Sequence, residues 1–420
     1  MAIPAQAPGC ALPAPHEVAG WVRYVARQAI LDLHGKVHAY ELLFRDGSEA
    51  AFRGDGNQAS RIMVDNTLLF GLGKLTCGLP AFVNCTAETL TGDWVRLLPA
   101  GMTVLEVLED IEFTPEVVQA CRRLKTLGFR LALDDFVWRA GVEPLVKLAD
   151  YIKVDFVATS YFERRALLER LHDTAVALVA EKVETEEEYR EARELGFTLV
   201  QGYYFCRPVL LENRKVPANR MTQIEILSKL QDESVDMHEL AEMVKRDTSL
   251  TYRLLRLVNS PVCAIQQEVR SVETALVAVG HESFRRLATL AIASELNEGR
   301  PLELLRMAFV RARFCELAAE SYQLDGTEQY LLGLLSLLPA MLRLPMSDLV
   351  ASLPLRKEIL TALQEETGTA CCLLRWLKGH ERGDWATCDA LVSSYALKRG
   401  ELLRCYAEAA IWAEAVLRLT

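Results

Sequence analysis

The amino-acid sequence predicts an α/β (β/α)8 TIM-like barrel followed by an all-α helical domain. The first observation behind this prediction is that short apolar β-type segments alternate with helical patterns from Val22 to about Pro208. The second is that beyond the polar stretch Glu212–Asn219 one helical pattern follows another. Repeated βα units of this length are typical of a largely parallel sheet. A chain of 420 residues also has the length expected for two domains.

These patterns predict the domain boundaries. We expect an N-terminal tail at residues 1–20, a barrel domain at 21–210, a linker at 211–220 and a helical domain at 221–420. An open doubly wound sheet is the structural alternative to the barrel. That fold would normally carry a glycine-rich phosphate loop after an early strand, and the sequence has none there, so we favour the barrel.

The barrel elements follow from the alternating pattern. The expected strands are Val22–Ile30, Val37–Leu43, Phe82–Cys85, Met102–Val107, Arg130–Leu133, Tyr151–Val154, Ala175–Ala180 and Thr198–Tyr203. The expected helices are Ala59–Leu72, Ala87–Leu97, Pro115–Leu127, Val142–Leu148, Arg164–His172 and Glu186–Leu195. Because the turn Leu33–Lys36 is short, the first two strands should pair antiparallel. Gly128 and Gly196 are expected to end the helices that precede them.

The second half of the sequence predicts only helices. They are Thr222–Gln231, Met237–Arg246, Ser249–Asn259, Val272–Val279, His281–Leu296, Pro301–Tyr322, Glu328–Leu338, Met346–Ala351, Arg356–Gln364, Ala370–Lys378, Asp384–Val392 and Lys398–Leu417. Asp247 or Thr248 is expected to cap the helix that starts at Ser249. Gly379 should end a helix, and Pro339 and Pro345 should bracket a break between helices.

Composition limits the classes of partner and compartment. Hydrophobic residues make up 51% of the chain and the net charge is −10, which argues against a general nucleic-acid binder. The 11 cysteines are an odd number without a CxxC pair, as expected in a reducing compartment. Residues 1–18 lack the features of a signal peptide, and the longest apolar run, Leu331–Leu344, is too short to span a membrane. We therefore expect a cytoplasmic protein without a membrane segment.

Polar residues end or follow the predicted strands of the first half. They are Glu41, Asn84, Glu106, Asp134, Asp135, Lys153, Glu181 and Gln201. In a (β/α)8 barrel the C-terminal ends of the strands meet at one mouth, which carries the chemistry. Five acidic residues and one asparagine gathered there would form an oxygen-rich site suited to Mg²⁺ or Mn²⁺.

The motifs around these residues resemble those of a known family. They are Glu41-Leu42-Leu43-Phe44-Arg45, Val83-Asn84, Leu105-Glu106-Val107-Leu108-Glu109, Asp134-Asp135-Phe136, Ile152-Lys153-Val154-Asp155, Ala180-Glu181-Lys182-Val183-Glu184-Thr185 and Gln201-Gly202-Tyr203. In this order they resemble the EAL family of cyclic diguanylate phosphodiesterases, with Leu42 in the place of the usual alanine. The stretch from Asp247 to Pro261 resembles the HDOD domain, a helical relative of the HD hydrolases.

The EAL resemblance implies roles for individual residues. Glu41, Asn84, Glu106 and Asp134 would hold one divalent metal ion, Mg²⁺ or Mn²⁺, and Asp135 would help to hold a second. Lys153 would orient the attacking water, with Asp135, Glu181 and Gln201 completing the catalytic set. Arg45 would meet a phosphate of the cyclic diguanylate ligand, which Glu41 and Gln201 would also contact. Two such ions can activate water and stabilise both oxygens of an in-line displacement.

Departures from the family pattern leave two functions open. The segment Phe136–Gly141 is bulky where the family has small residues, Lys182 stands where the family has glycine, and the stretch between Lys153 and Glu181 is short. The barrel is therefore expected either to hydrolyse cyclic diguanylate or to act as a receptor or scaffold that binds without cutting. The helical half lacks an adjacent His-Asp pair, since the one such pair is His172-Asp173. We expect that half to bind a protein partner as an output domain, and a homodimer remains open.

Overall fold

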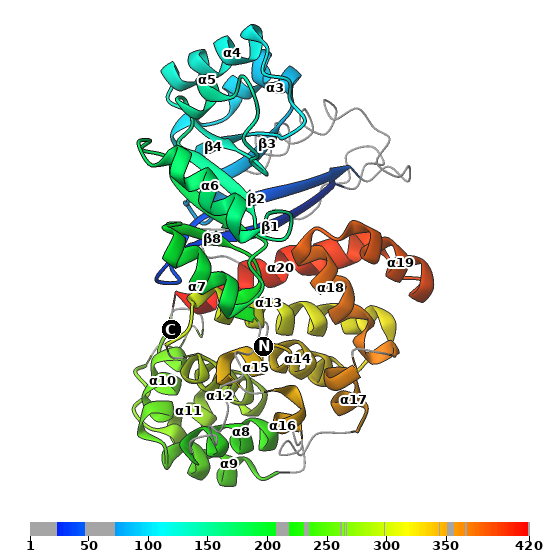
Figure 1. The fold of residues 1–420 in the computed structure, drawn as a ribbon. Coiled ribbons are helices and arrows are strands. Elements are labelled where there is room, and N and C mark those ends of the chain that lie inside the picture. The colour runs from blue at the N-terminus through cyan, green and yellow to red at the C-terminus, as the bar shows by residue number, and fades with distance from the viewer. Residues whose placement is uncertain are drawn as a thin grey trace. The chain divides into compact units, whose positions relative to one another are not determined.

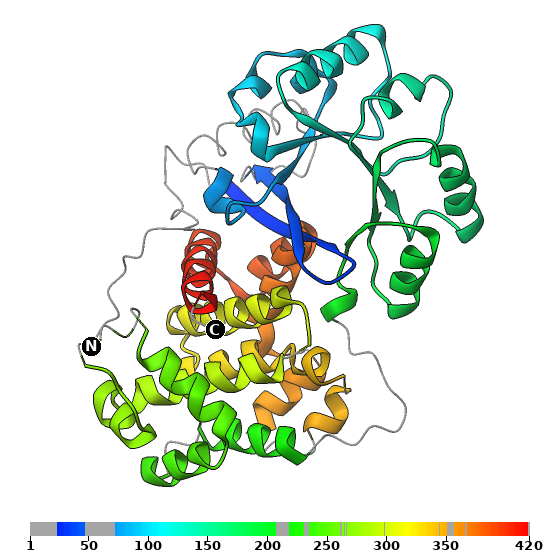
Figure 2. The ribbon, with the colours of Figure 1, turned by 90° about the vertical axis from the view of Figure 1, so that its left-hand side faces the viewer.

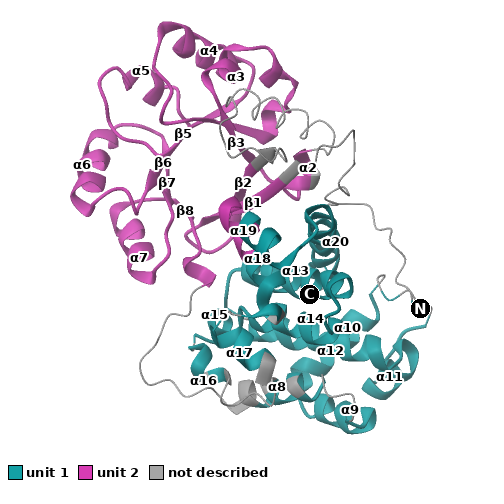
Figure 3. Cartoon of the chain, turned by 90° about the vertical axis from the view of Figure 1, so that its right-hand side faces the viewer, with its two compact units in different colours: residues 1–8, 208–377, 389–420 teal, residues 9–207, 378–388 magenta. Residues whose placement is uncertain are grey.

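The structure is a computed structural model that describes most of the chain. The described residues are 23–46, 72–206, 218–230, 235–260, 263, 265, 267–297, 299–343, 345–350, 357–365 and 368–418. The chain divides into two compact units, which Figure 3 colours separately. Residues 9–207 and 378–388 form the barrel unit, and residues 1–8, 208–377 and 389–420 form the helical unit.

Eight strands close into a barrel in sequence order, as predicted. The strands are β1 Arg23–Asp32, β2 Val37–Asp46, β3 Ala81–Cys85, β4 Thr103–Val107, β5 Arg130–Leu133, β6 Tyr151–Asp155, β7 Ala177–Glu181 and β8 Leu199–Gln201. From β2 to β8, neighbouring strands pair in parallel, whereas β1 is antiparallel to both β2 and β8. The reversal at β1 follows from its tight turn, in which Asp32 N donates to Lys36 O at 2.9 Å and Gly35 has φ 78°.

Helices surround the ring of strands, as Figures 2 and 3 show from opposite ends of the barrel. The helices are α2 Leu72–Leu75, α3 Ala87–Thr91, α4 Pro115–Thr126, α5 Glu143–Val146, α6 Tyr161–Leu171 and α7 Glu186–Leu195. Capping fixes several starts: Ser160 and Thr185 each form a capping box with a glutamate three residues on. Because Ser160 caps it, α6 begins three residues before the predicted Arg164.

One predicted barrel helix is broken, and another lies outside the description. The helix expected at Ala87–Leu97 ends at Thr91, because Gly92 adopts an extended conformation before the 3-10 turn Trp94–Leu97. The helix expected at Ala59–Leu72 falls almost wholly on residues 47–71, outside the described part of the chain.

The C-terminal part is all-α, as predicted (Figure 1). Its helices are α8 Ala218–Lys229, α9 Met237–Lys245, α10 Thr248–Val258, α11 Val272–Val279, α12 His281–Leu296, α13 Leu302–Ala319, α14 Gly326–Leu335, α15 Leu338–Leu342, α16 Met346–Val350, α17 Lys357–Glu365, α18 Cys372–Arg382, α19 Trp385–Tyr395 and α20 Arg399–Leu417. Asp247 caps α10 by accepting a hydrogen bond from Leu250 N at 3.1 Å. Within the described residues, no helix has both the length and the apolar character needed to cross a membrane.

Two expected helix ends in this part are wrong. Gly379 does not end a helix: α18 continues to Arg382 and stops before Gly383, which has φ 69°. Gly379 instead permits close packing, since a Cβ there would lie 3.1 Å from Cys388 Sγ. The segment between Pro339 and Pro345 is not a simple break either, because Pro339 lies in the first turn of the short helix α15.

Candidate active site at the barrel mouth

The barrel interior is filled by an apolar layer to which every strand contributes one side chain. In strand order these residues are Ile30, Ala39, Phe82, Val104, Ala132, Tyr151, Val179 and Leu199. Side chains alternate along a strand, so the residue two positions away faces the same interior. The next interior layer toward the mouth is therefore fixed by the register of the first.

That next layer is polar at all eight positions. Two residues further along each parallel strand, and two residues back along the reversed β1, stand Gln28, Glu41, Asn84, Glu106, Asp134, Lys153, Glu181 and Gln201. We call these eight residues the polar layer. Seven of them are the strand-end residues singled out in the sequence. Gln28 was missed because it lies inside β1 and not at the end of a strand, although the expected antiparallel pairing of the first two strands could have revealed it.

Lys153 lies at the centre of the polar layer and is almost fully buried. Its Nζ lies 3.1 Å from Glu41 Oε2, 2.5 Å from Glu106 Oε1, 2.8 Å from Asp134 Oδ1 and 2.8 Å from Glu181 Oε1. The exposed fraction of the Lys153 side chain is 1%, and that of the Glu106 side chain is 0%. Four carboxylates thus surround one ammonium in a region from which water is largely excluded. An excess of buried negative charge is costly unless protons or a cation offset it.

The amides of the layer orient Glu41. Gln201 Nε2 donates to Glu41 Oε2 at 2.7 Å and to Gln28 Oε1 at 3.0 Å. Asn84 Nδ2 donates to Glu41 Oε1 at 3.4 Å. Both oxygens of Glu41 are therefore held by neighbours from β3, β6 and β8, which fixes this side chain more firmly than any other carboxylate of the layer.

The pKa values of the four carboxyl groups differ in direction: three are raised and that of Glu41 is lowered. Burial, reinforced by the nearby charge of Glu41, raises the pKa of Glu106 well above its usual range. Burial also raises the pKa of Asp134 and brings that of Glu181 to about 8, despite the attraction of Lys153. Burial opposes ionisation of Glu41 too, but the charge of Lys153 and the hydrogen bonds from the amides outweigh it and lower the pKa of Glu41. The surrounding carboxylates raise the pKa of Lys153 despite its burial.

Several buried oxygens of the mouth have no hydrogen-bond partner. They are Asn84 Oδ1, Glu106 Oε2, Asp135 Oδ1, Glu181 Oε2 and Gln201 Oε1. Buried polar atoms are nearly always satisfied, so a group of unpartnered oxygens at one place points to a missing donor or cation. Among the described residues, however, no three His, Cys, Asp or Glu side chains are already spaced to hold a metal ion. The carboxylates converge on Lys153 Nζ instead.

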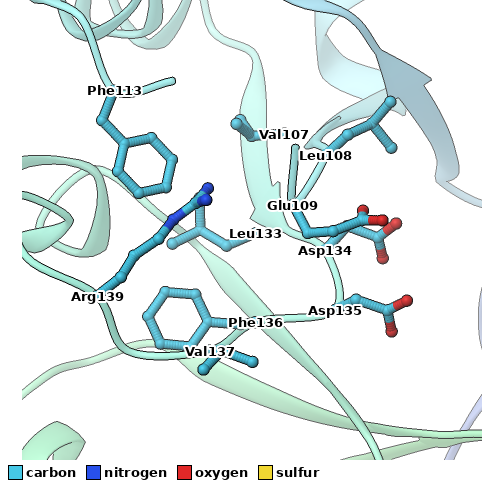
Figure 4. A pocket seen from close by; sticks show the side chains of 10 residues that line it. All are labelled: Val107, Leu108, Glu109, Phe113, Leu133, Asp134, Asp135, Phe136, Val137 and Arg139. Atoms are coloured by element: carbon cyan, nitrogen blue, oxygen red, sulfur yellow. The ribbon is translucent and has the colours of Figure 1, made fainter. Parts of the chain in front are cut away.

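A cavity of about 260 Å³ adjoins Asp134 and Asp135 at the ends of β4 and β5. In Figure 4 the carboxylates of Glu109, Asp134 and Asp135 stand on one side, and Phe113 and Arg139 lie together on the other. The guanidinium of Arg139 lies 4.1 Å from the centre of the Phe113 ring, and its Nη2 donates to Ile111 O at 3.0 Å. The bulky segment Phe136–Gly141 noted in the sequence is thus tied by Arg139 to the loop that follows β4.

The remaining sequence-derived residues fall into three groups. Asp135 follows Asp134 at the mouth but faces Lys182 and not Lys153. The side chain of Arg45, at the end of β2, lies outside the described part of the chain. His172 and Asp173 lie just after α6, with side chains 69% and 85% exposed, on the outside of the barrel unit. Sequence reasoning gave no role to Asp155, which also contacts Lys182.

Two domain families match the chain. The EAL domain matches residues 88–208, and the HDOD domain matches residues 216–348. The EAL match begins after Gln28, Glu41 and Asn84, so these three members of the polar layer lie outside it.

Two proteins are similar to the chain over nearly its whole length. The uncharacterized protein YuxH of Bacillus subtilis (strain 168) is 32% identical over 400 residues, which cover 93% of this chain and 97% of YuxH. The cyclic di-GMP phosphodiesterase CdgJ of Vibrio cholerae serotype O1 is 31% identical over 415 residues, which cover 96% of this chain and 95% of CdgJ. Both similarities extend well beyond either domain match alone.

Proposed function

Because the chain belongs to the family of two-domain EAL–HDOD proteins, we propose that its barrel hydrolyses cyclic diguanylate to the linear dinucleotide with the help of a divalent metal ion. The observation that carries this proposal is the polar layer, in which four carboxylates gather around Lys153 and Asn84, Glu106, Glu181 and Gln201 each keep an unpartnered buried oxygen. CdgJ, a relative along the full chain, is named a cyclic di-GMP phosphodiesterase.

The donor set suits a hard divalent cation. Carboxylate and amide oxygens are the ligands that Mg²⁺ and Mn²⁺ prefer, and the unpartnered oxygens of Asn84 and Glu106 lie in the layer without a donor. Glu41, Asn84, Glu106 and Asp134 would hold the ion. When bound, such an ion would supply positive charge for the phosphodiester oxygens and would make water a better nucleophile.

The protein's own groups would bind and orient the reactants. Lys153 is the one ammonium inside the polar layer, and its N–H donors can orient the attacking water once the carboxylates have another cation. Gln201 on β8 and Glu41 on β2, the two strands that flank β1, are hydrogen-bonded to each other, and they would contact the ligand. Phe113 and Phe136 line the cavity beside Asp134, where they would contact a nucleobase.

The test is product formation by purified full-length protein with cyclic diguanylate and Mg²⁺ or Mn²⁺, followed by chromatography. We expect linear dinucleotide from the unmodified protein and a loss of at least about 100-fold in Glu41→Ala, because that side chain would contact both the ion and the ligand. Glu116→Ala is the matched control, since Glu116 is an exposed glutamate on α4. Full turnover by Glu41→Ala would disprove the assignment.

A receptor that binds cyclic diguanylate without cutting it is the second candidate. It is favoured by the attachment of the Phe136–Gly141 segment through Arg139 and by the absence of a ready-spaced metal cluster among the described residues. In that case the helical unit would transmit ligand binding to a protein partner. Tight nucleotide binding by a protein that makes no product with either ion would select this function.

A further inference from the structure

Three charged side chains form a second group at the mouth, above the polar layer. They are Asp135 after β5, Asp155 at the end of β6 and Lys182 directly after β7. Lys182 Nζ contacts Asp155 Oδ2 within hydrogen-bond distance and lies 3.4 Å from Asp135 Oδ2. Two carboxylates from two strand ends thus converge on one ammonium from a third.

The backbone brings these side chains together in two ways. Asp155 lies two residues beyond Lys153, so strand alternation alone places it on the interior face, one step nearer the mouth. Asp135 and Lys182 directly follow members of the polar layer, and alternation would turn them away. Both adopt left-handed conformations instead, with φ 39° at Asp135 and φ 54° at Lys182.

The left-handed conformation is notable at Lys182. Aspartate tolerates it through local hydrogen bonds, but for lysine it costs roughly 1–2 kcal/mol. Hydrogen bonds on either side hold the backbone in place: Phe156 N donates to Glu181 O, and Val183 N to Gln201 O, each at 3.1 Å. The fold therefore keeps a strained lysine at a position from which its ammonium reaches both carboxylates.

Asp155 is prepared to receive a cation on one oxygen. Its Oδ1 accepts from Val157 N at 2.6 Å and from Ala158 N at 2.9 Å, which leaves Oδ2 for Lys182. Burial alone would raise the pKa of Asp155, but the hydrogen bonds from Lys182 and these amides outweigh it and lower the pKa. The side chain of Asp155 is only 9% exposed, so a cation beside it is poorly screened by water.

We infer that Lys182 supplies the cation of the Asp135–Asp155 carboxylate pair and thereby excludes a divalent ion from it. This inference rests on the proposed function, because it concerns the metal content of the same mouth. The sequence predicted that Asp135 would help to hold a second ion. The position of Lys182 does not fit that prediction, and the mouth takes one divalent ion in the polar layer beside one fixed ammonium. The unpartnered Asp135 Oδ1 stays available to the polar layer or the ligand.

The competing interpretation is an ordinary surface salt bridge. The Lys182 side chain is 53% exposed, and exposed ion pairs contribute only about 0–1 kcal/mol. A lysine held that weakly would move aside for a second Mn²⁺. The two interpretations therefore differ in the number of ions bound, which can be counted without any turnover.

The experiment counts Mn²⁺ bound per full-length protein by calorimetric titration and by the electron paramagnetic resonance of free Mn²⁺. We expect one ion in the unmodified protein, one in Lys182→Arg and two in Lys182→Gly. Glycine adopts φ 54° without strain and carries no charge, so it opens the pair without distorting the loop. The double variant Lys182→Gly/Asp155→Asn should return to one ion, because it removes a ligand of the opened position.

Two ions in the unmodified protein, or no gain in Lys182→Gly with an unchanged circular dichroism spectrum, would overturn the inference. Its failure can be told apart from failure of the proposed function. One ion in the unmodified protein, two in Lys182→Gly and no hydrolysis by either would disprove the proposed phosphodiesterase activity. The inference about Lys182 would still hold. Rapid hydrolysis by an unmodified protein that binds two ions would support the proposed function and disprove the inference about Lys182.

Discussion

Buried charge is balanced in the helical unit and unbalanced in the barrel. On α13, Arg306 lies between Glu303 and Glu414, and Glu316 lies between Arg286 and Arg313. Counted together, the two clusters match three guanidiniums with three carboxylates, so they carry no net charge. In the polar layer of the barrel, four carboxylates face the single ammonium of Lys153.

This difference in charge balance distinguishes buried ion pairs that serve the fold from buried charges that serve a binding site. A balanced buried network can be kept for packing and specificity, whereas an unbalanced one is tolerated only where a ligand completes it. The same stability measurements on both units should therefore give results of opposite sign when a buried charge is removed.

The largest effect is expected from Arg306→Met in the helical unit. The substitution removes the cation that the buried Glu303 and Glu414 share and should cost about 3–5 kcal/mol of unfolding free energy. Urea unfolding followed by circular dichroism measures it. Arg404→Met is the control, because Arg404 is 52% exposed and its pair with Glu408 should contribute under about 0.5 kcal/mol. Equal losses in the two variants would contradict the contrast between the units.

The next largest losses of stability are expected from alanine substitutions at two glycines, one in each unit. A Cβ at Gly202 would lie 2.1 Å from Val183 O, and one at Gly333 would lie 2.3 Å from Arg311 O. Alanine at either position should cost about 2–4 kcal/mol, because backbone must move. Only Gly202→Ala should also weaken Mn²⁺ binding, since it displaces the neighbouring Gln201. Gly101→Ala, which meets no atom within 4 Å, is the control and should stay within about 0.5 kcal/mol.

Glu106→Gln should change the free energy of unfolding in the opposite direction, toward higher stability. It removes one carboxylate from the unbalanced layer while keeping its shape, so the metal-free protein should gain about 1–2 kcal/mol. The stabilisation that Mn²⁺ confers on the unmodified protein should largely disappear. Thermal unfolding in EDTA and in Mn²⁺ tests both expectations, and a less stable Glu106→Gln protein in EDTA would show that the layer is balanced after all.

The smallest effect concerns His38 on β2, at the far end of the barrel from the mouth. Partial burial and the charge of Arg130 lower its pKa, against the opposing charge of Asp32, and its Nε2 lies 3.2 Å from Tyr151 Oη. The unfolded chain then binds the proton more tightly, so stability is lost as the pH falls below about 6.5. Between pH 7.5 and 5.5, His38→Gln should lose less stability than the unmodified protein, by under about 1 kcal/mol. Identical losses would contradict the lowered pKa.

The alternation of apolar and polar residues explains how much of the barrel could be predicted. Short β-type runs that end in a polar residue predicted both the closed barrel and seven members of the polar layer. Side chains two residues apart on a strand face the same side, so the polar residue at the mouth shares the interior with the apolar residue before it. Gln28 was not found this way, since it lies inside the reversed strand β1 and not at the end of a strand. The role of Lys182 escaped for a different reason: its left-handed backbone is imposed by hydrogen bonds to neighbouring strands.

Helix ends were harder to predict where tertiary packing decides them. Gly92 and Gly379 have the same local preference to end a helix, yet Gly92 breaks one and Gly379 lies inside another. At Gly379 the lack of a side chain is used for close contact with Cys388, which no local pattern reveals. Pro339 similarly opens α15 where a break was expected.

The pairing of β1 with β8 has a consequence for how the chain folds during synthesis. Ile30 pairs with Gln201, so the ring cannot close until the last strand has left the ribosome. Until then β1 has a free edge, open to pairing with another chain. The Gln28–Gln201–Glu41 hydrogen bonds span this seam, so the polar layer is completed by the same late event that removes the edge. Nascent chains halted before residue 199 should therefore lack a complete polar layer and be prone to aggregate.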